Sequence, residues 1–288
     1  MGTHGWAYRR RQPEGTVLYE AVRDNLATLL AEASEGGRGL PRYVERDFAK
    51  YLECGVLAHG FARVRCESCK DELLVAFSCK GRGVCPSCTA KRAHVTAVHL
   101  VEQVLPHVPY RQWTLSFPHR VRWVLLKDVG LLSDVLTLFL RAVFALQRRT
   151  EVDVRPLPRK QPRCAFLEGF SLHANTHLHA NDRQGLERLC RYGARGALAL
   201  ERLSRAEDGR IAYRMKRPLP DGTTHLFFTG LELLRRVASL VPPPRANLTR
   251  FHGVFAPGAK LRPFLVPQSG AEEASAPSSR CGGGEREA

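Results

Sequence analysis

The chain has 288 residues, and 44% of them are hydrophobic, which is enough to bury one good core and a smaller satellite. Lys and Arg number 44 against 28 Asp and Glu, so the formal net charge is +16. This imbalance argues against an ordinary small-molecule enzyme and favours a polyanionic partner, namely nucleic acid. No apolar run reaches the roughly 18 residues of a membrane span, and the N-terminus lacks the apolar centre of a signal peptide. The sequence therefore predicts a protein of the reducing cytoplasm with no membrane partner.

The first part of the chain is predicted to be a helical and zinc-binding DNA-binding domain over residues 16–107, after a disordered basic stretch over 1–15. Apolar residues at helical spacing predict three helices, over residues 16–35, 41–52 and 89–105. Between the second and third helices the chain is dense in Gly and Cys. Its only sheet-like runs are residues 62–65 and 73–77, which is typical of short strands held by a metal.

The second part of the chain is predicted to be an α+β unit, so the fold class expected for the whole protein is α+β. Residues 108–150 begin this unit with a half-buried strand at 112–117 and an apolar helix at 133–149 that belongs in a core. Residues 151–164 are rich in proline and charge and are expected to form a linker. Residues 165–268 form the C-terminal region. Its predicted elements are a helix at 182–192, a hairpin of strands 210–216 and 223–228, and a helix that starts with a capping box at Thr229 and Glu232. A disordered tail is expected over 269–288.

Four cysteines have the spacing of a structural zinc site. Cys66 and Cys69 form one close pair, Cys85 and Cys88 form another, and fifteen residues separate the pairs. Each pair can place two thiolates on one ion at about 2.3 Å, and four thiolates leave no open position for chemistry. Unrelated reduced thiols, or disulfides in an oxidised sample, are the alternative.

Two further cysteines and one histidine lie near these pairs. Cys54 and Cys79 can each substitute as a ligand, but a small buried cysteine is the commoner role for such residues. His59 can also ligate a metal, although a single loop histidine is more often polar surface. The basic residues around the pairs can neutralise phosphates without reading bases, and they are Arg63, Arg65, Lys70, Lys80, Arg82, Lys91 and Arg92.

Several segments resemble the rolling-circle insertion-sequence transposases of the HUH type, in the IS ninety-one group. The residues that carry the resemblance are 51–66, 77–88, 111–118, 170–174, 186–192, 221–225 and 247–257. The first two segments are similar to the family's zinc-binding domain, and the third to the first strand of its nuclease core. Together the motifs cover most of residues 7–268. The resemblance implies a transposase that binds transposon ends and cleaves single-stranded DNA.

The resemblance also implies a mechanism. In the family a tyrosine hydroxyl attacks DNA, forms a phosphotyrosine link and frees a 3′ hydroxyl, with a divalent metal such as Mg²⁺ or Mn²⁺ polarising the phosphate. Tyr192 matches the nucleophile position. Arg188, Arg191 and Arg195 are near enough along a helix to hold the attacked phosphate. Gly193 and Gly196 replace the family's helix-continuing residues after the tyrosine.

The metal pair of the nuclease is expected to be missing. His177 and His179 spell the family's His-hydrophobic-His pattern, but their neighbours are polar and turn-forming, and they lie after the position where the family places its pair. The long stretch that should carry that pair is absent between about 149 and 164, so we interpret the chain as an internally deleted form. His225 and His252 match family motifs without an assigned role. The alternative function is a non-catalytic zinc-ribbon DNA-binding protein, either a remnant or a regulator.

Overall fold

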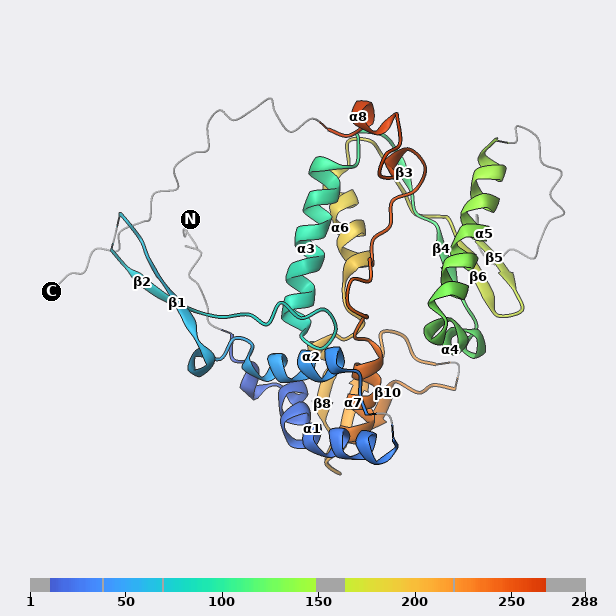
Figure 1. Ribbon diagram of the computed structural model, residues 1–288. Coiled ribbons are helices and arrows are strands. Elements are labelled where there is room, and N and C mark those ends of the chain that lie inside the picture. The colour runs from blue at the N-terminus through green and yellow to red at the C-terminus, as the bar shows by residue number, and fades with distance from the viewer. Residues whose placement is uncertain (1–10, 38, 69, 149–163, 220, 268–288) are drawn as a thin grey trace. The chain divides into compact units, whose positions relative to one another are not determined.

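The computed structural model describes residues 11–37, 39–68, 70–148, 164–219 and 221–267 (Figure 1). The chain forms two compact units, and helices combine with small antiparallel sheets in an α+β fold, as predicted. One unit contains the chain up to residue 105 together with the chain from residue 187. The other contains residues 106–186. Among the described residues, no helix has both the length and the apolar character that crossing a membrane requires.

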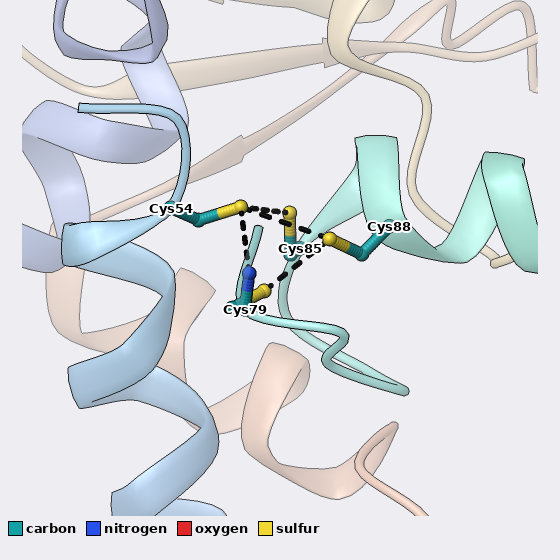
Figure 2. A group of neighbouring side chains, drawn as sticks. All are labelled: Cys54, Cys79, Cys85 and Cys88. Carbon is teal, nitrogen blue, oxygen red and sulfur yellow. Dashed lines mark hydrogen bonds between the residues drawn. The ribbon is translucent and has the colours of Figure 1, made fainter. Parts of the chain in front are cut away.

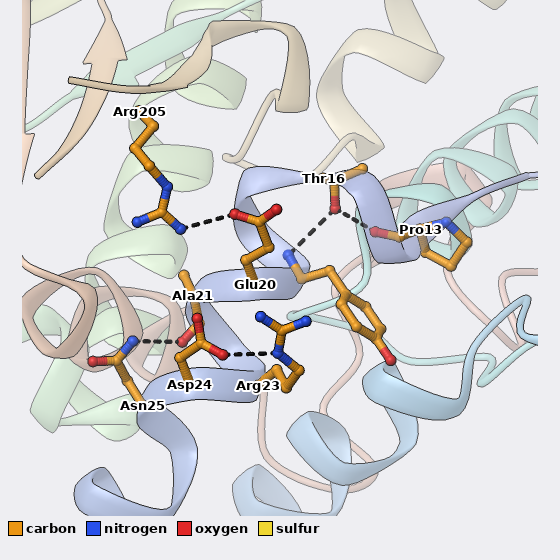
Figure 3. Close-up of polar contacts among 9 residues, drawn as sticks. Pro13, Thr16, Glu20, Ala21, Arg23, Asp24, Asn25 and Arg205 are labelled. Atoms are coloured by element: carbon orange, nitrogen blue, oxygen red, sulfur yellow. Dashed lines mark hydrogen bonds and ion pairs between the residues drawn. The ribbon is translucent and has the colours of Figure 1, made fainter. Parts of the chain in front are cut away.

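The first helix, α1 (Val17–Glu35), starts where the sequence predicts it. The Thr16 hydroxyl accepts the amide of Tyr19 at 3.3 Å, which is an N-cap, and donates to the carbonyl of Pro13 at 2.8 Å (Figure 3). Pro13 is buried and begins a short 3₁₀ helix, Pro13–Gly15. Residues 11–15 therefore have defined structure, which differs from the disorder expected for them, whereas residues 1–10 lie outside the described part.

Two distant parts of the sequence build one hydrophobic core in the first unit. Helices α1 and α2 (Arg42–Glu53) come from the N-terminal part. Helix α7 (Gly230–Ser239) and the sheet β10-β9-β8 (His225–Phe228, Ile211–Arg214, Leu203–Arg205) come from the C-terminal part. Leu18, Phe48, Ile211 and Leu234 are fully buried or nearly so in this core.

The shared core differs from the boundaries expected from the sequence, which assigned these segments to separate domains. The amphipathic faces of α1 and α7 cover each other, so neither segment has a complete core alone. Ion pairs also connect α1 with the C-terminal segments. Arg205 lies 2.8 Å from Glu20, and Arg235 lies 2.5 Å from Glu32 (Figure 3 shows the first pair).

A hairpin and a long helix complete the N-terminal part of this unit. Strands β1 (Phe61–Arg65) and β2 (Glu72–Ala76) pair antiparallel, with Phe61 opposite Ala76 and Arg65 opposite Glu72. Most residues of the hairpin are exposed. The hairpin follows a 3₁₀ turn, Leu57–His59, and leads through residues 77–85 into helix α3 (Pro86–Gln103).

The second unit contains two small sheets and two helices. Strand β3 (Tyr110–Arg111) pairs with β7 (His177–Leu178), and the strand order of the other sheet is β4-β6-β5 (Thr114–Ser116, Phe170–His173, Cys164–Leu167). Helices α4 (His119–Lys127) and α5 (Val129–Arg148) lie between the strands in sequence. The expected linker over 151–164 and tail over 269–288 fall almost wholly outside the described residues, with only Cys164 described.

Helix α5 is less covered than its apolar sequence predicts. Leu138 is 63% exposed and Leu146 is 47% exposed, although the sequence favours a place in a core for this helix. Its strongest contacts are with α4, and no sheet strand makes a comparable set of contacts with it among the described residues. The sheets of this unit have only two and three strands, so they offer little apolar surface to a 20-residue helix.

Helix α6 (Arg183–Ala194) connects the two units, and the boundary between them falls within it, after Leu186. The remaining elements of the first unit are two 3₁₀ turns, Leu200–Arg202 and Gly253–Phe255, and a short helix, α8 (Arg262–Leu265). The helix boundaries for α1, α2, α3 and α6 agree with the sequence prediction to within a few residues. The capping box of α7 is also confirmed, with both hydrogen bonds between Thr229 and Glu232 present.

Candidate functional site

Four thiol groups meet beneath the first helix turn of α3. They belong to Cys54, Cys79, Cys85 and Cys88, and their sulfur atoms all lie within 4.8 Å of one another (Figure 2). The sulfur of Cys88 lies 3.7 Å from that of Cys54 and 3.5 Å from that of Cys79, and the Cys54–Cys85 separation is 3.7 Å. A tetrahedron with metal–sulfur bonds of about 2.3 Å has edges of about 3.8 Å. The thiols are therefore spaced as the ligands of one zinc ion.

Each thiol is placed by the end of an element. Cys54 caps the C-terminus of α2, and Cys79 follows β2. Cys85 is the N-cap residue of α3, and Cys88 lies three residues later on the same face of the helix. Three of the four are buried, and Cys79 is partly buried. Water is largely excluded from the cluster, which suits a closed structural ion rather than a catalytic one.

Backbone and side-chain donors surround the sulfur atoms. The amide of Cys79 donates to the sulfur of Cys54, and the amide of Gly81 donates to the sulfur of Cys79, both at 3.3 Å. Hydrogen bonds among the thiols, first of all the one from Cys79, lower the pKa of Cys54, and the same bond raises the pKa of Cys79. The two amide bonds remain when the sulfurs are thiolates, so they can stabilise the negative sulfurs around a cation.

The Arg11 guanidinium lies against the cluster from outside. It donates to the carbonyl of Cys54 at 2.8 Å and lies 3.6 Å from the sulfur of Cys54 and 4.0 Å from that of Cys85. Burial alone lowers the pKa of Arg11, but the charges of Cys85 and Cys54 outweigh burial and raise it. Four thiolates and one Zn²⁺ carry a net charge of about −2, so a partly buried cation at this place offsets part of that charge.

This set of four differs from the set expected from the spacing. Cys85 and Cys88 are present as expected, whereas Cys66 lies beyond the end of β1, at the turn of the hairpin, and Cys69 lies outside the described residues. The register of the hairpin explains the difference. The amide of Gly55 donates to the carbonyl of Phe77, which brings the chain after β2 back to Cys54. Cys66 lies at the far end of β1 from Cys54, and a five-residue strand is about 16 Å long.

The sequence interpretation gave Cys54 and Cys79 a minor role, and it missed Arg11. Six cysteines lie between residues 54 and 88, so the spacing of Cys66, Cys69, Cys85 and Cys88 is not the only combination that the sequence offers. Arg11 had no comparable signal, because a basic terminal stretch has no pattern that distinguishes one arginine from the next. His59 is exposed and is not part of the cluster.

The basic residues named from the sequence divide into two groups. Arg63, Arg65 and Lys70 belong to the hairpin, where Arg63 and Arg65 form ion pairs with Glu72. The others lie close to the thiol cluster in sequence: Lys80 and Arg82 between the cysteines, and Lys91 and Arg92 at the start of α3. Arg92 donates to the carbonyl of Lys80 at 2.8 Å, which joins the helix to the loop that carries Cys79.

Tyr192 lies in the last turn of α6 and is 54% exposed. The guanidinium carbon of Arg195 lies 4.2 Å from the centre of its ring, a cation–π contact. Its hydroxyl makes no hydrogen bond to any described residue. Arg188 and Arg191 are exposed on the same helix, and Arg191 lies 3.7 Å from Glu187.

Helix α6 is attached to the helix that the thiol cluster anchors. The Nδ1 atom of His94 on α3 lies 3.5 Å from the carboxylate of Glu187 on α6. Just after α6, a Cβ atom built on Gly196 would lie 3.0 Å from Cγ2 of Thr89, which is one residue beyond Cys88. Figure 1 shows α3 and α6 alongside each other. The segment with Tyr192 thus touches the start and middle of α3 at two points, Glu187 with His94 and Gly196 with Thr89.

The histidines of the His-hydrophobic-His pattern lie in the second unit. His177 is in β7, opposite Arg111 of β3, and His179 follows the strand. Their rings are 5.4 Å apart and nearly perpendicular, and both are exposed. Among the described residues, the thiol cluster is the only group of three or more possible metal ligands, so no third ligand joins this pair. His225 begins β10 and His252 is exposed before the last 3₁₀ turn.

Comparison with known families defines the class of protein. A family described as "Transposase zinc-binding domain" matches residues 22–117, which contain the thiol cluster, and a family described as "Putative transposase" matches residues 130–262, which contain Tyr192. No curated protein and no solved structure matches the chain. The protein is a transposase with a zinc-binding domain. The chain belongs to the IS ninety-one group of transposases.

Proposed function

We propose that this transposase binds the single-stranded DNA of transposon ends with the basic surface around its zinc cluster, and that Tyr192 cleaves and transfers the strand. One observation carries the proposal. The exposed Tyr192 lies on a helix that contacts α3, and α3 starts at two of the zinc ligands and displays Lys91 and Arg92. The tyrosine and the cations are thus parts of one unit.

The proposed reaction is a transesterification. The Tyr192 oxygen attacks phosphorus, an O–P bond forms to the tyrosine, and the bond from phosphorus to the 3′ oxygen of the leaving strand breaks. The phenolic proton is lost and the 3′ oxygen gains one, so the products are a 5′ phosphotyrosine and a 3′ hydroxyl. The phosphoester bond is exchanged rather than hydrolysed, so its free energy is kept for the joining step.

The arginines near Tyr192 match the charge that develops on the phosphate. The guanidinium groups of Arg188, Arg191 and Arg195 are the nearest cations along the chain, and planar guanidinium groups bind phosphate oxygens through paired hydrogen bonds. Arg195 already lies over the Tyr192 ring. A phosphate beside the hydroxyl would therefore meet at least one cation without a large movement of the backbone.

A divalent ion, Mg²⁺ or Mn²⁺, would offset charge on the nonbridging oxygens if it binds with the DNA. His177 and His179 are the residues that have the family's pattern for such an ion. Two exposed imidazoles form only part of a metal site, so phosphate oxygens of the DNA and water would have to complete the coordination.

The test is covalent capture of DNA. Labelled single-stranded transposon-end DNA is incubated with the protein and Mn²⁺, and a denaturing gel is examined for a protein-linked band. We expect a band for the wild type and none for Tyr192→Phe. Tyr213→Phe, which removes a hydroxyl from β9 in the same unit, is the matched control and should keep the band. A band in Tyr192→Phe would assign the chemistry to another residue.

A second function is favoured by the incomplete metal pair. If His177 and His179 hold no ion, the protein binds transposon DNA without cutting it, and acts as a regulator or as a competitor for the ends. This function predicts DNA binding of equal strength in the wild type and in Tyr192→Phe, with no adduct in either. The capture experiment therefore separates the two functions.

A further inference from the structure

A small basic pocket lies beside the zinc cluster and shares Cys79, Lys80 and Arg82 with the surface described above. One face of α2 lines it with Tyr43, Arg46, Asp47 and Lys50, which are spaced so that they share one side of the helix. The loop 79–82 and the segment 241–244 after α7 form the other walls, and the cavity volume is about 210 Å³. All three segments are in the first unit.

Four cations surround this pocket, from two different segments. Arg46 and Lys50 come from α2, and Lys80 and Arg82 come from the loop. Within the described parts of the chain, none of the four forms an ion pair with a carboxylate, although eight such pairs form elsewhere. Like charges brought together without counterions repel each other, so an anion in the pocket would relieve that repulsion.

The one carboxylate in the pocket, Asp47, is already used by the loop. Its Oδ2 atom accepts the amides of Val84 at 2.9 Å and of Gly83 at 3.2 Å. A Cβ atom on Gly81 would lie only 2.8 Å from Oδ1 of Asp47, so the loop also passes very close to this side chain. Asp47 therefore shapes the loop, and its charge is partly satisfied by backbone donors.

The zinc cluster holds the loop cations in place. Cys79 contributes to the pocket wall as well as to the cluster, and the amide of Gly81 bonds to its sulfur. Arg82, which also lines the pocket, donates one N–H to the carbonyl of Ala246, and this bond fixes its guanidinium. Arg82 is thus pre-positioned, so it loses little conformational entropy when it binds an anion.

We propose that this pocket binds a phosphate group of the DNA strand. The inference deepens the proposed function and rests on it. The volume is below the range of about 300 to 1,000 Å³ that holds a whole small-molecule ligand, so a single phosphate with its sugar fits better than a nucleotide cofactor. Val241, Pro242 and Pro244 provide an apolar wall for the sugar, and the Tyr43 ring lies at the edge. The phosphate is either internal to the strand or at its 5′ end.

The experiment compares the wild type with Arg46→Gln/Lys50→Gln. Both residues are exposed on α2 and glutamine is a good helix former, so the variant should fold. Binding of a fluorescent 20-nucleotide single strand is measured by anisotropy over a range of salt concentrations. Loss of the one phosphate contact in the pocket should reduce the slope of log affinity against log salt by about 0.7. The control is Lys216→Gln/Arg217→Gln, which removes the same charge from an exposed segment of the same unit.

Two strands distinguish the sources of the phosphate, one with a 5′ phosphate and one with a 5′ hydroxyl. An internal phosphate predicts that the pocket variant weakens both strands equally, whereas a terminal phosphate predicts that it weakens the phosphorylated strand more. Either result supports the pocket. An unchanged slope in the pocket variant, or an equal loss in the control, overturns it.

A failure of the proposed function gives a different result. If the wild type binds neither strand, DNA binding itself is wrong, and inorganic phosphate becomes the probe of the pocket. A phosphate-dependent rise in melting temperature that is present in the wild type and lost in Arg46→Gln/Lys50→Gln would still support an anion site. The same rise in both proteins, or no rise in either, would count against it.

Discussion

The Nδ1 atom of His94 lies 3.5 Å from a carboxylate oxygen of Glu187, and this contact joins the helix that starts at the zinc cluster to the helix that carries Tyr192. The contact of Gly196 with Thr89 joins the same two segments a few residues further on. The zinc ion would therefore stabilise more than its own loop. It would fix the base of α3, and through α3 the position of the candidate nucleophile.

The close approach at Gly196 predicts opposite effects for two neighbouring glycines. In Gly196→Ala the new Cβ lies 3.0 Å from Cγ2 of Thr89, so this methyl group must give by a few tenths of an ångström. Because Thr89 is buried, we expect a loss of about 1 kcal/mol in the free energy of unfolding. In Gly193→Ala the new Cβ meets nothing within 4 Å, and the helix gains about 0.5 to 1 kcal/mol. Urea unfolding measures both. Equal effects at the two positions would show that the segment after α6 is not in contact with α3 at Thr89.

Single cysteine variants decide between the two possible zinc ligand sets. Cys54→Ser and Cys79→Ser each remove a thiol of the cluster, and we expect both proteins to lose most of their zinc and much of their stability. Cys66→Ser lies outside the cluster and should keep about one zinc per chain at wild-type stability. Metal analysis of the purified proteins gives the answer. Zinc loss in Cys66→Ser, with zinc kept in Cys54→Ser, would restore the set expected from the spacing.

Local patterns predicted most of the helices of this protein. The apolar spacing after Thr16 and the capping box at Thr229 depend only on residues within a few positions. The N-terminal ends of α1 and α7 can therefore be predicted from the sequence. The pair Cys85 and Cys88 is predictable for the same reason. Both cysteines lie within four residues at the start of α3, so their spacing depends only on local structure.

Long-range pairing was not predictable from these patterns. The partners of Cys85 and Cys88 depend on the register of the β1–β2 hairpin, which places Cys79 rather than Cys66 near Cys54. The shared core of α1 and α7 joins segments about 200 residues apart, and amphipathic spacing shows that a helix needs a partner without showing which one. The role of Arg11 depends on both of these arrangements, so it became visible only in the structure.

The capping box of α7 gives a prediction for the shared core. Thr229→Ala removes the acceptor of the Glu232 amide, which lies 3.2 Å from the hydroxyl, and should cost about 1 kcal/mol. Because α7 covers α1, the loss should appear in the cooperative unfolding of the whole first unit and not as local fraying. Ser239→Ala at the other end of α7 removes only a bond to the carbonyl of Arg236 and should cost less than about 0.5 kcal/mol. Unfolding followed by circular dichroism and by zinc release should give one midpoint in each variant; separate midpoints would contradict the shared core.

The position of Arg11 predicts that a residue outside the ligand set controls zinc affinity. Arg11→Met removes a positive charge beside two thiols and the hydrogen bond to the carbonyl of Cys54, and we expect zinc affinity to fall about 10- to 100-fold. Arg11→Lys keeps the charge without the planar donors, so it should lie between the wild type and Arg11→Met. Arg23→Gln, which removes an exposed arginine paired only with its neighbour Asp24, is the control and should leave the affinity unchanged. Competition with a chromogenic chelator measures all four proteins. Wild-type affinity in Arg11→Met would mean that the cluster does not need a nearby cation, and that Arg11 only ties the N-terminal segment to α2.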